Sequence, residues 1–345
     1  MDMKQALFAL SACTGPSGAE QGVYETAKEI LEPYVRSVTR DVMGNLIGIR
    51  TAKKRSQECI LLDAHLDEVG MLVTDHDKGY LKFAAIGIDP RILPGLEVKV
   101  CTEPPMFGVV TCLPPHVVPA DEREKAFEMD DLRVDCGLSE EEAAARVPVG
   151  TRIVYGTKPF TMGKSLVCGK SLDDRACFVI LCRVMELLKD EELPLDVCVL
   201  GSVQEEYTAL GAVTGAYNMM PTEAIVADVS FAETPDTPKA ESKPLGTGPM
   251  IGVGPVENRR MSQKLIALAK EIGIPYTREV LPGRTGTNAD EIQISREGVA
   301  VCNVSLPLRY MHTPIEVVDL EDMEHSAQLI AAYIRSRKSN GAKSR

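Results

Sequence analysis

Apolar residues in this chain fall into two kinds of pattern: short continuous runs and helical repeats. Continuous runs, which are typical of strands buried inside a sheet, begin or fill residues 58–74, 195–203, 223–230 and 299–306. A shorter strand-like segment with a turn at Gly44-Asn45 occupies residues 38–50. The pattern predicts a sheet with several buried strands.

Helical repeats separate these runs. Residues 171–190 form a long apolar helical pattern and residues 259–274 an amphipathic one, while residues 319–338 place Met323 and Ala327 on one face. Residues 16–35 predict a helix that opens with a capping box, in which Ser17 precedes Glu20 by three positions. Strands that alternate with helices predict an α/β fold, an open sheet covered by helices on both faces.

The pattern changes between about residues 75 and 160. Short β-rich pieces separated by proline and glycine turns replace the long runs, which predicts a small inserted domain. We therefore expect a discontinuous α/β domain of residues 1–72 and 164–345, interrupted by a β-rich domain of residues 73–163.

Charge excludes some partners. The 345 residues carry a formal net charge of −12 and no tryptophan, so the chain lacks the basic face that nucleic acids and anionic membranes require. The first residues do not form a secretory signal, and no window is apolar enough to span a bilayer. Several of the ten cysteines lie inside apolar runs and no Cys-x-x-Cys motif occurs, which predicts reduced thiols in a cytoplasmic protein.

Ionisable residues follow nearly every buried run. In open α/β sheets ligands bind beyond the carboxyl ends of the strands, so these residues are expected to converge on one site. At the ends of the runs lie His65, Asp67, Glu205, Glu206, Asp228 and His312, and the start of the helix predicted at residues 171–190 adds Asp173 and Asp174.

Two imidazoles with three carboxylates suit Zn²⁺, Co²⁺ or Mn²⁺. One ion with five protein ligands would leave no open position, whereas two ions that share a carboxylate would leave room for water. The doublet Asp173-Asp174 is a candidate source of the shared ligand. Each residue also has a structural interpretation: His65 as a core histidine, the doublet as a complement to a helix dipole, and Asp228 as a strand-end cap.

The order of these motifs resembles the M42 family of metallo-aminopeptidases, which includes TET-type and glutamyl aminopeptidases and relatives named endoglucanase M. The resemblance rests on DAHLDEVG (63–70), GKSLDDR (169–175), VQEE (203–206), IVADVS (225–230) and RYMHTPIE (309–316). It extends over nearly the whole chain.

The resemblance implies a zinc-peptidase-like mixed sheet flanked by helices, with an inserted PDZ-like dimerisation domain. It implies two divalent ions per subunit, with Zn²⁺ or Co²⁺ preferred over Mn²⁺. By motif position, His65 and Asp228 would bind one ion, and Glu206 and His312 would bind the other. Asp173 would bridge the two ions, Glu205 would be the general base, and Asp67 would orient His65. The implied activity is the release of N-terminal residues from peptides with a free N-terminus, by homodimers that assemble into homododecamers.

Three departures from the family pattern leave the ligands intact. Tyr207, Thr208 and Ala209 replace the usual sequence after the base, Asn288 stands in an acidic position, and Ile86 stands for a glycine. Another amide hydrolase on the same metal site, such as a deacylase, and a non-catalytic assembly protein stay open as alternatives. A glycosidase is disfavoured because metal-bound carboxylates cannot also serve as its acid and nucleophile.

Overall fold

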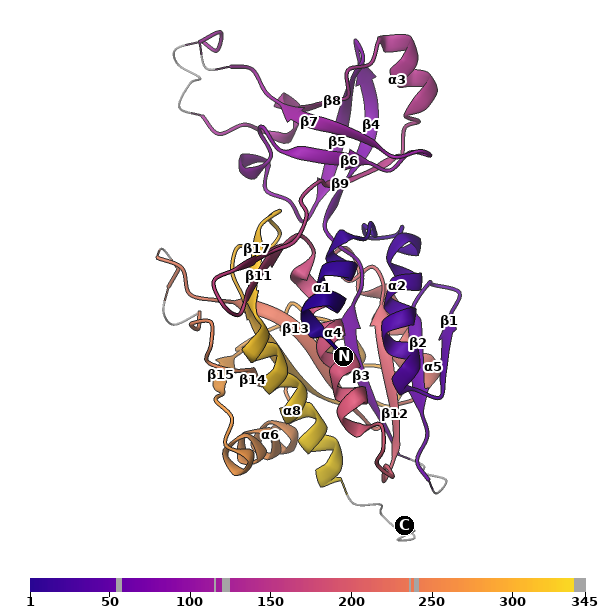
Figure 1. The fold of residues 1–345 in the computed structure, drawn as a ribbon, viewed down its shortest axis with the longest axis vertical. Helices are drawn as coiled ribbons and strands as arrows, with labels where there is room; N and C mark the ends of the chain where they lie inside the picture. Colours follow the sequence, from indigo (N-terminus) through magenta and orange to yellow (C-terminus); the bar gives the residue numbers. More distant parts are fainter. Residues whose placement is uncertain (54–57, 115, 120–124, 236, 239–241, 338–345) are drawn as a thin grey trace.

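The computed structural model describes residues 1–53, 58–114, 116–119, 125–235, 237–238 and 242–337. A large α/β body holds both described ends of the chain, and a small β-barrel projects from one end of it (Figure 1). Along the described residues, no helix combines the length and apolar character needed to cross a membrane.

An eight-stranded sheet in the order β1-β2-β12-β3-β13-β16-β14-β15 forms the centre of the body. Its strands are β1 (Ser37–Arg40), β2 (Leu46–Arg50), β3 (Cys59–His65), β12 (Asp196–Ser202), β13 (Glu223–Phe231), β14 (Met250–Val253), β15 (Thr277–Val280) and β16 (Ala300–Leu308). The four central strands run parallel, whereas β2 and β14 pair antiparallel with β12 and β16. The predicted α/β fold is confirmed, with a mixed sheet.

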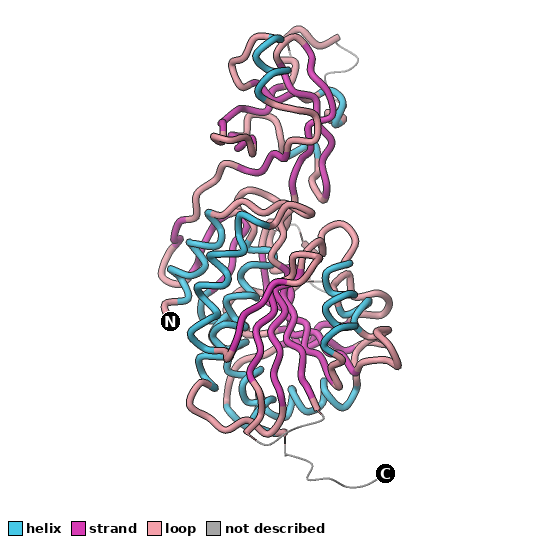
Figure 2. Tube along the Cα trace, turned by 90° about the vertical axis from the view of Figure 1, so that its right-hand side faces the viewer, coloured by secondary structure: helices cyan, strands magenta, loops and turns pink. Residues whose placement is uncertain are grey.

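Helices cover both faces of this sheet (Figure 2). They are α1 (Met3–Ala12), α2 (Gln21–Leu31), α4 (Leu172–Leu188), α5 (Leu210–Met219), α6 (Arg259–Ile272), α7 (Ala289–Ile292) and α8 (Leu320–Ser336), with the short 3₁₀ turn η1 (Glu32–Tyr34). Side chains of β3 alternate between two cores: Leu62 packs in the cluster that includes α4 and α8, and Leu61 in the cluster that includes α5 and α7. A strand buried on both faces explains why these segments read as continuous apolar runs.

The β-rich region expected between the two parts of the α/β body is a closed barrel in the order β4-β5-β8-β7-β6-β9. Its elements are β4 (Gly70–Asp77), β5 (Tyr80–Ile86), η2 (Pro90–Ile92), β6 (Glu97–Val100), β7 (Met106–Thr111), η3 (Met129–Asp131), β8 (Arg133–Asp135), α3 (Glu140–Arg146) and β9 (Arg152–Tyr155). The barrel has an apolar core of its own, with Leu81, Val98 and Val134 fully buried. A small sheet of β10 (Phe160–Met162), β11 (Leu166–Gly169) and β17 (Glu316–Asp319) follows it.

The capping box predicted before α2 is wrong. The helix begins at Gln21 with Glu20 as its N-cap residue, and no side chain caps it. Glu20 instead accepts hydrogen bonds from the backbone N–H groups of Gly18 and Gln204, at 2.6 and 3.2 Å from its Oε1. The Glu20 carboxylate, which the local sequence pattern assigned to a helix cap, therefore binds the backbone of Gln204, a residue distant in the sequence.

Candidate active site

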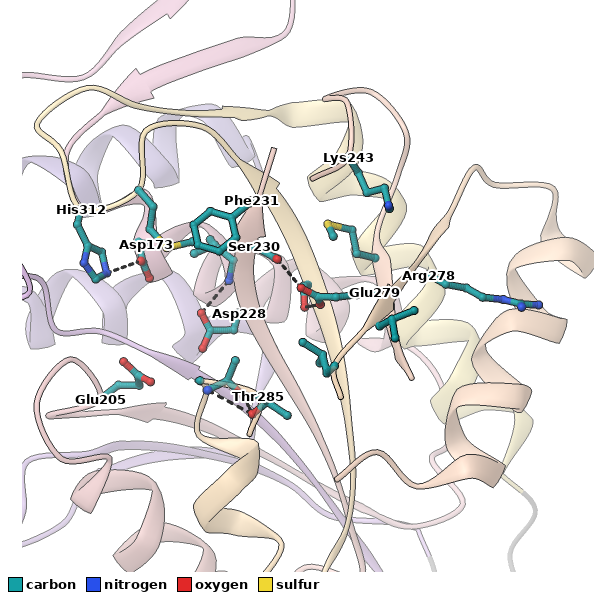
Figure 3. A pocket seen from close by; sticks show the side chains of 18 of the residues that line it. Asp173, Glu205, Asp228, Ser230, Phe231, Lys243, Arg278, Glu279, Thr285 and His312 are labelled. Carbon is teal, nitrogen blue, oxygen red and sulfur yellow. Dashed lines mark hydrogen bonds and ion pairs between the residues drawn. The ribbon is translucent and has the colours of Figure 1, made fainter. Parts of the chain in front are cut away.

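The predicted residues meet at the carboxyl ends of β3, β12 and β13. Figure 3 shows Asp173, Glu205, Asp228 and His312 around one cavity there. His65 is the last residue of β3 and lies opposite Ser202, the last residue of β12. Asp173 stands at the start of α4, which packs against β3 and β13, and His312 lies in the loop between β16 and β17. Parallel pairing thus joins residues that are far apart in the sequence.

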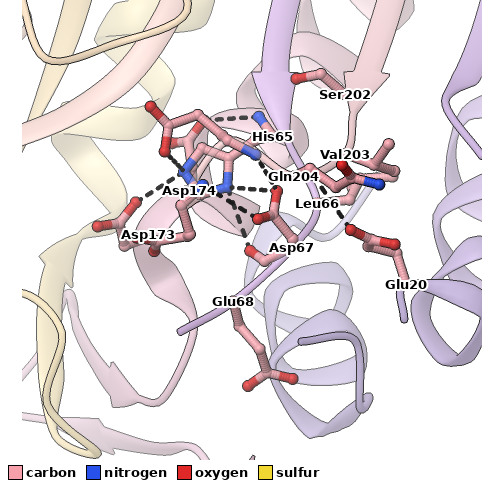
Figure 4. A network of polar contacts seen from close by, with 12 residues as sticks. Glu20, His65, Leu66, Asp67, Glu68, Asp173, Asp174, Ser202, Val203 and Gln204 are labelled. Atoms are coloured by element: carbon pink, nitrogen blue, oxygen red, sulfur yellow. Dashed lines mark hydrogen bonds and ion pairs between the residues drawn. The ribbon is translucent and has the colours of Figure 1, made fainter. Parts of the chain in front are cut away.

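His65 is held by contacts on both ring nitrogens (Figure 4). Nδ1 lies 3.2 Å from the backbone oxygen of Asp67, and Nε2 lies 3.1 Å from Oδ1 of Asp173. A backbone oxygen can only accept, so we assign a proton to Nδ1, and Nε2 is the ring nitrogen that faces Asp173 and would bind a cation there.

His312 is oriented by the barrel. Its Nδ1 lies 2.8 Å from the backbone oxygen of Gly87, in the loop after β5, and Tyr155 of β9 donates a hydrogen bond of 2.9 Å to the His312 backbone oxygen. Nε2 then lies 3.3 Å from Oδ2 of Asp173 and 3.3 Å from Oε2 of Glu206. Asp173 therefore lies between the two imidazoles.

Gly87 has the small size and backbone conformation that this contact needs. Its φ is +69°, and a Cβ added there would lie 2.7 Å from the Val69 side chain and 3.4 Å from Nδ1 of His312. Ile86, the departure from the family's usual glycine, precedes it without occupying this close approach.

Asp67 fixes the backbone of the adjacent glutamates. Its Oδ1 accepts the N–H of Glu205 at 3.0 Å, and its Oδ2 accepts the N–H of Glu206 at 3.2 Å. The expectation was that Asp67 orients His65; its carboxylate lies 3.4 Å from Nδ1 of that ring and also orders the Glu205-Glu206 turn. Oε2 of Glu205 lies 3.8 Å from Nε2 of His65.

Burial makes this cluster of acids electrostatically unfavourable by itself. It raises the pKa of Glu206 and of Asp228 well above the ordinary carboxyl value, and burial with the nearby Asp173 charge raises the pKa of Glu205 to about 7. Burial opposes ionisation of Asp173 as well, but hydrogen bonds from His312 and His65 lower its pKa. A positive charge in the centre would relieve this repulsion.

The M42 glutamyl aminopeptidase family model matches residues 44–329 of the chain. The chain belongs to the M42 family. The resemblance inferred from the motifs is therefore confirmed over most of the sequence.

M42 relatives resemble the chain over nearly its full length. The lysyl aminopeptidase of Pyrococcus furiosus is 32% identical in an alignment of 331 positions that covers 94% of this chain and 94% of that protein. Aminopeptidase APDkam598 from the archaeon Desulfurococcus kamchatkensis superposes with a TM-score of 0.91 at 31% identity and 99% coverage of both chains. The Pyrococcus horikoshii TET1 peptidase, which can assemble into a tetrahedron or a large octahedral shell, has a TM-score of 0.84 at 30% identity, covering 96% of this chain and 99% of its own.

Membership of the M42 family implies divalent metal ions, and the side chains fit them. His65, Asp173 and Glu206 offer ligand atoms that all lie within 4.8 Å of one another, as do His65, Asp174 and Asp228. Oε1 of Glu206 and Oδ1 of Asp174 are buried and have no hydrogen-bond partner among the described residues. Buried carboxylate oxygens without donors, beside imidazoles, are suitable ligands for a borderline divalent cation.

Several supporting residues carried no signal of their role in the sequence. Buried Glu316 accepts the N–H of His312 at 2.8 Å through Oε1 and the N–H of Leu172 at 2.7 Å through Oε2, which ties the His312 loop to the start of α4. Asp174, named only as part of the doublet, accepts the N–H of His65 at 3.2 Å. The HTPIE motif contained Glu316, but its position four residues after His312 gave no local signal of this contact.

The departures lie at the edge of the site or behind it. Tyr207 is exposed. Asn288 is buried and donates from Nδ2 to Asp63 at 2.8 Å and to Ser202 at 2.9 Å, at the ends of β3 and β12. An amide donates to Asp63 without adding a second negative charge behind the acidic cluster.

Proposed function

We propose that this M42 protein is a metal-dependent aminopeptidase with two divalent ions per subunit, Zn²⁺ or Co²⁺ in preference to Mn²⁺. His65 and Asp228 would hold one ion, Glu206 and His312 the other, and Asp173 would bridge them. The observation that carries this proposal is the placement of Asp173, with Oδ1 3.1 Å from Nε2 of His65 and Oδ2 3.3 Å from Nε2 of His312. One carboxylate that faces two imidazoles suits a shared ligand.

The chemistry is hydrolysis of a peptide bond, as in the named relatives. When bound, the ions would acidify a water molecule and stabilise the negative charge that develops on the scissile carbonyl oxygen. Glu205 would accept the proton of the attacking water at its carboxylate and then pass it to the nitrogen of the leaving amine. Asp67 would hold the backbone of this base in place through its contact with the Glu205 N–H.

The acidic cluster would favour substrates with a free N-terminus. A substrate α-ammonium group would be attracted to the carboxylates that surround the site, whereas an acylated N-terminus carries no charge. Such binding would bring the first peptide bond, rather than an internal one, beside Glu205.

Peptides with free and blocked N-termini test this function. We expect the enzyme loaded with Zn²⁺ or Co²⁺ to cleave alanyl-alanyl-p-nitroanilide and to leave the N-acetylated peptide intact, and removal of metal by a chelator to abolish turnover. Release of acetate from the blocked peptide would favour a deacylase. Absence of tightly bound metal together with absence of hydrolysis would favour a non-catalytic assembly protein.

The barrel is proposed to be the dimerisation domain. The proposal keeps residues 73–163 as a PDZ-like insert between 1–72 and 164–345, in subunits that dimerise and assemble into dodecamers. Support comes from β7, where Phe107 and Val109 are exposed while Gly108 and Val110 are buried, and from exposed Leu113 just after it. A row of exposed apolar side chains is typical of a protein interface.

Phe107→Asp is expected to shift the native mass toward smaller species, because a carboxylate on this row would be desolvated at an interface. Light scattering after gel filtration measures the shift. Val42→Asp is the control, since Val42 is a single, fully exposed apolar residue in the turn between β1 and β2. Equal masses for Phe107→Asp and the unchanged protein would reject this row as an interface.

Cellular location is proposed to be cytoplasmic. All ten cysteines are free thiols in the structure, including Cys59 and Cys198, whose sulfur atoms lie 3.3 Å apart without a bond. Neighbouring reduced thiols suit a reducing compartment.

A further inference from the structure

The cavity beside the metal ligands continues away from them toward β15. It has a volume of about 600 Å³ and extends from Asp173 and Asp228 to Glu279 on the edge strand. Phe231, Met250 and Met311 contribute apolar surface to its wall. Such a cavity is large enough for one amino-acid side chain of the substrate.

Glu279 is the acidic group at the far part of this cavity (Figure 3). Ser230 of β13 donates a hydrogen bond to its Oε1, and Ser305 of β16 donates one of 2.6 Å to its Oε2. Ser230 follows Asp228 by two positions on the same strand, so both side chains face the same side of the sheet. Glu279 is therefore held in a fixed position by a serine that lies two residues from Asp228, a proposed metal ligand.

The two serines do not saturate this carboxylate. An ionised carboxylate offers about four acceptor sites, and each oxygen of Glu279 receives one serine hydroxyl. Burial raises the pKa of Glu279 by more than the two serine hydrogen bonds and the charge of Lys243 lower it, so its negative charge lacks full compensation.

Cationic side chains of the protein line the same cavity but do not pair with Glu279. Within the part of the chain that the structure describes, no ion pair within 4.0 Å joins Lys243 or Arg278 to this carboxylate, although the charge of Lys243 acts on it from a greater distance. Arg278 is exposed, and Figure 3 shows its side chain directed away from the metal ligands. Glu279 thus has no direct cationic partner among the described residues, and a cation that enters the cavity can pair with it.

We infer that Glu279 is a specificity-determining residue that selects peptides whose N-terminal residue has a long, positively charged side chain, lysine or arginine. The apolar walls of the cavity would contact the aliphatic stem of the substrate side chain, and the Glu279 carboxylate would pair with its charged end. This inference rests on the proposed aminopeptidase function, because it assigns the cavity to the side chain of the residue released.

Lysyl- and norleucyl-p-nitroanilide test the inference, since they share a straight four-carbon stem and differ by the ammonium group. We expect the unchanged enzyme to show a kcat/KM about 10- to 100-fold higher for the lysyl substrate, the range expected for a hydrogen bond between charged groups. Glu279→Gln should remove most of this difference while it leaves norleucyl hydrolysis and metal content unchanged. Glu279→Asp, which keeps the charge, should retain part of the preference.

Glu271→Gln is the matched control, because Glu271 lies exposed at the end of α6. If Glu279→Gln lowered kcat/KM equally for the lysyl and norleucyl substrates, the inference would be overturned, and Glu279 would be assigned to binding of the substrate α-ammonium group. A higher kcat/KM for glutamyl-p-nitroanilide would overturn it in favour of selection by Lys243. In either case norleucyl hydrolysis by the metal-loaded enzyme upholds the aminopeptidase function; failure to cleave any substrate with a free N-terminus would reject that function instead.

Discussion

Glu205→Gln is expected to lower kcat by roughly 10²- to 10⁴-fold while metal content stays close to that of the unchanged enzyme. The magnitude is that of a lost general acid-base group. An amide has nearly the shape of the carboxylate but cannot accept the proton of the attacking water. The backbone contact from Asp67 to the N–H of residue 205 does not depend on the side chain, so the turn should persist.

The neighbouring glutamate supplies a matched comparison. Glu206→Gln should weaken metal binding, because Oε2 of Glu206 lies 3.3 Å from Nε2 of His312 and its Oε1 is buried without a hydrogen-bond partner among the described residues. Elemental analysis and initial rates, measured for both variants over a series of metal concentrations, separate the two roles. Near-normal kcat in Glu205→Gln, or loss of metal from it comparable to that from Glu206→Gln, would contradict its assignment as the base.

Glu68→Gln is expected to lower the free energy of unfolding by about 3–5 kcal/mol, the range for breaking a buried ion pair. Glu68 is buried and pairs with Lys170 at 2.6 Å and with Arg175 at 3.1 Å, two cations that flank the Asp173-Asp174 doublet. Arg175 also donates to the backbone oxygens of Leu10 and Cys13 at 2.9 Å. Without the carboxylate, both cations would remain buried without an anion.

The difference in stability should depend on pH. Burial alone would raise the pKa of Glu68, but the charges of Lys170 and Arg175 lower it from 4.5 to about 2. A folded-state pKa below the unfolded value means that the contribution is complete above about pH 4.5 and is lost as the pH falls toward 2. The unchanged protein and Glu68→Gln should therefore approach each other in stability as the solution is acidified.

Urea denaturation of the metal-free proteins at several pH values measures this effect. Glu192→Gln is the control, because the Lys53–Glu192 pair is exposed and such pairs contribute about 0–1 kcal/mol. If Glu68→Gln lost no more stability than this control, the buried cluster would not be a major source of stability.

Local sequence pattern determined much of the fold and the composition of the site. Apolar runs with polar ends predicted β3, β12, β13 and β16, because a strand buried on both faces needs apolar residues at successive positions. Helical repeats predicted α6 and α8, because the core contacts one face of each helix at regular spacing. A long apolar pattern predicted α4, whose first eleven residues are all buried. The ionisable residues at the strand ends indicated the candidate site, because ligands of open α/β sheets bind beyond the carboxyl ends of the strands.

Tertiary structure decided how those residues are used. Glu20, predicted to cap a helix, instead accepts a hydrogen bond from the backbone N–H of Gln204. Glu316 joins the His312 loop to the start of α4, and Gly87, next to the barrel, orients the His312 ring. Glu279 lies in the cavity because β15 pairs with β14 at the edge of the sheet. These contacts join residues that are distant in the chain or meet only when whole elements pack together. The spacing of apolar and polar residues within one segment specifies which face of that segment is buried; which distant donor or charge will meet it is set by how the elements pack.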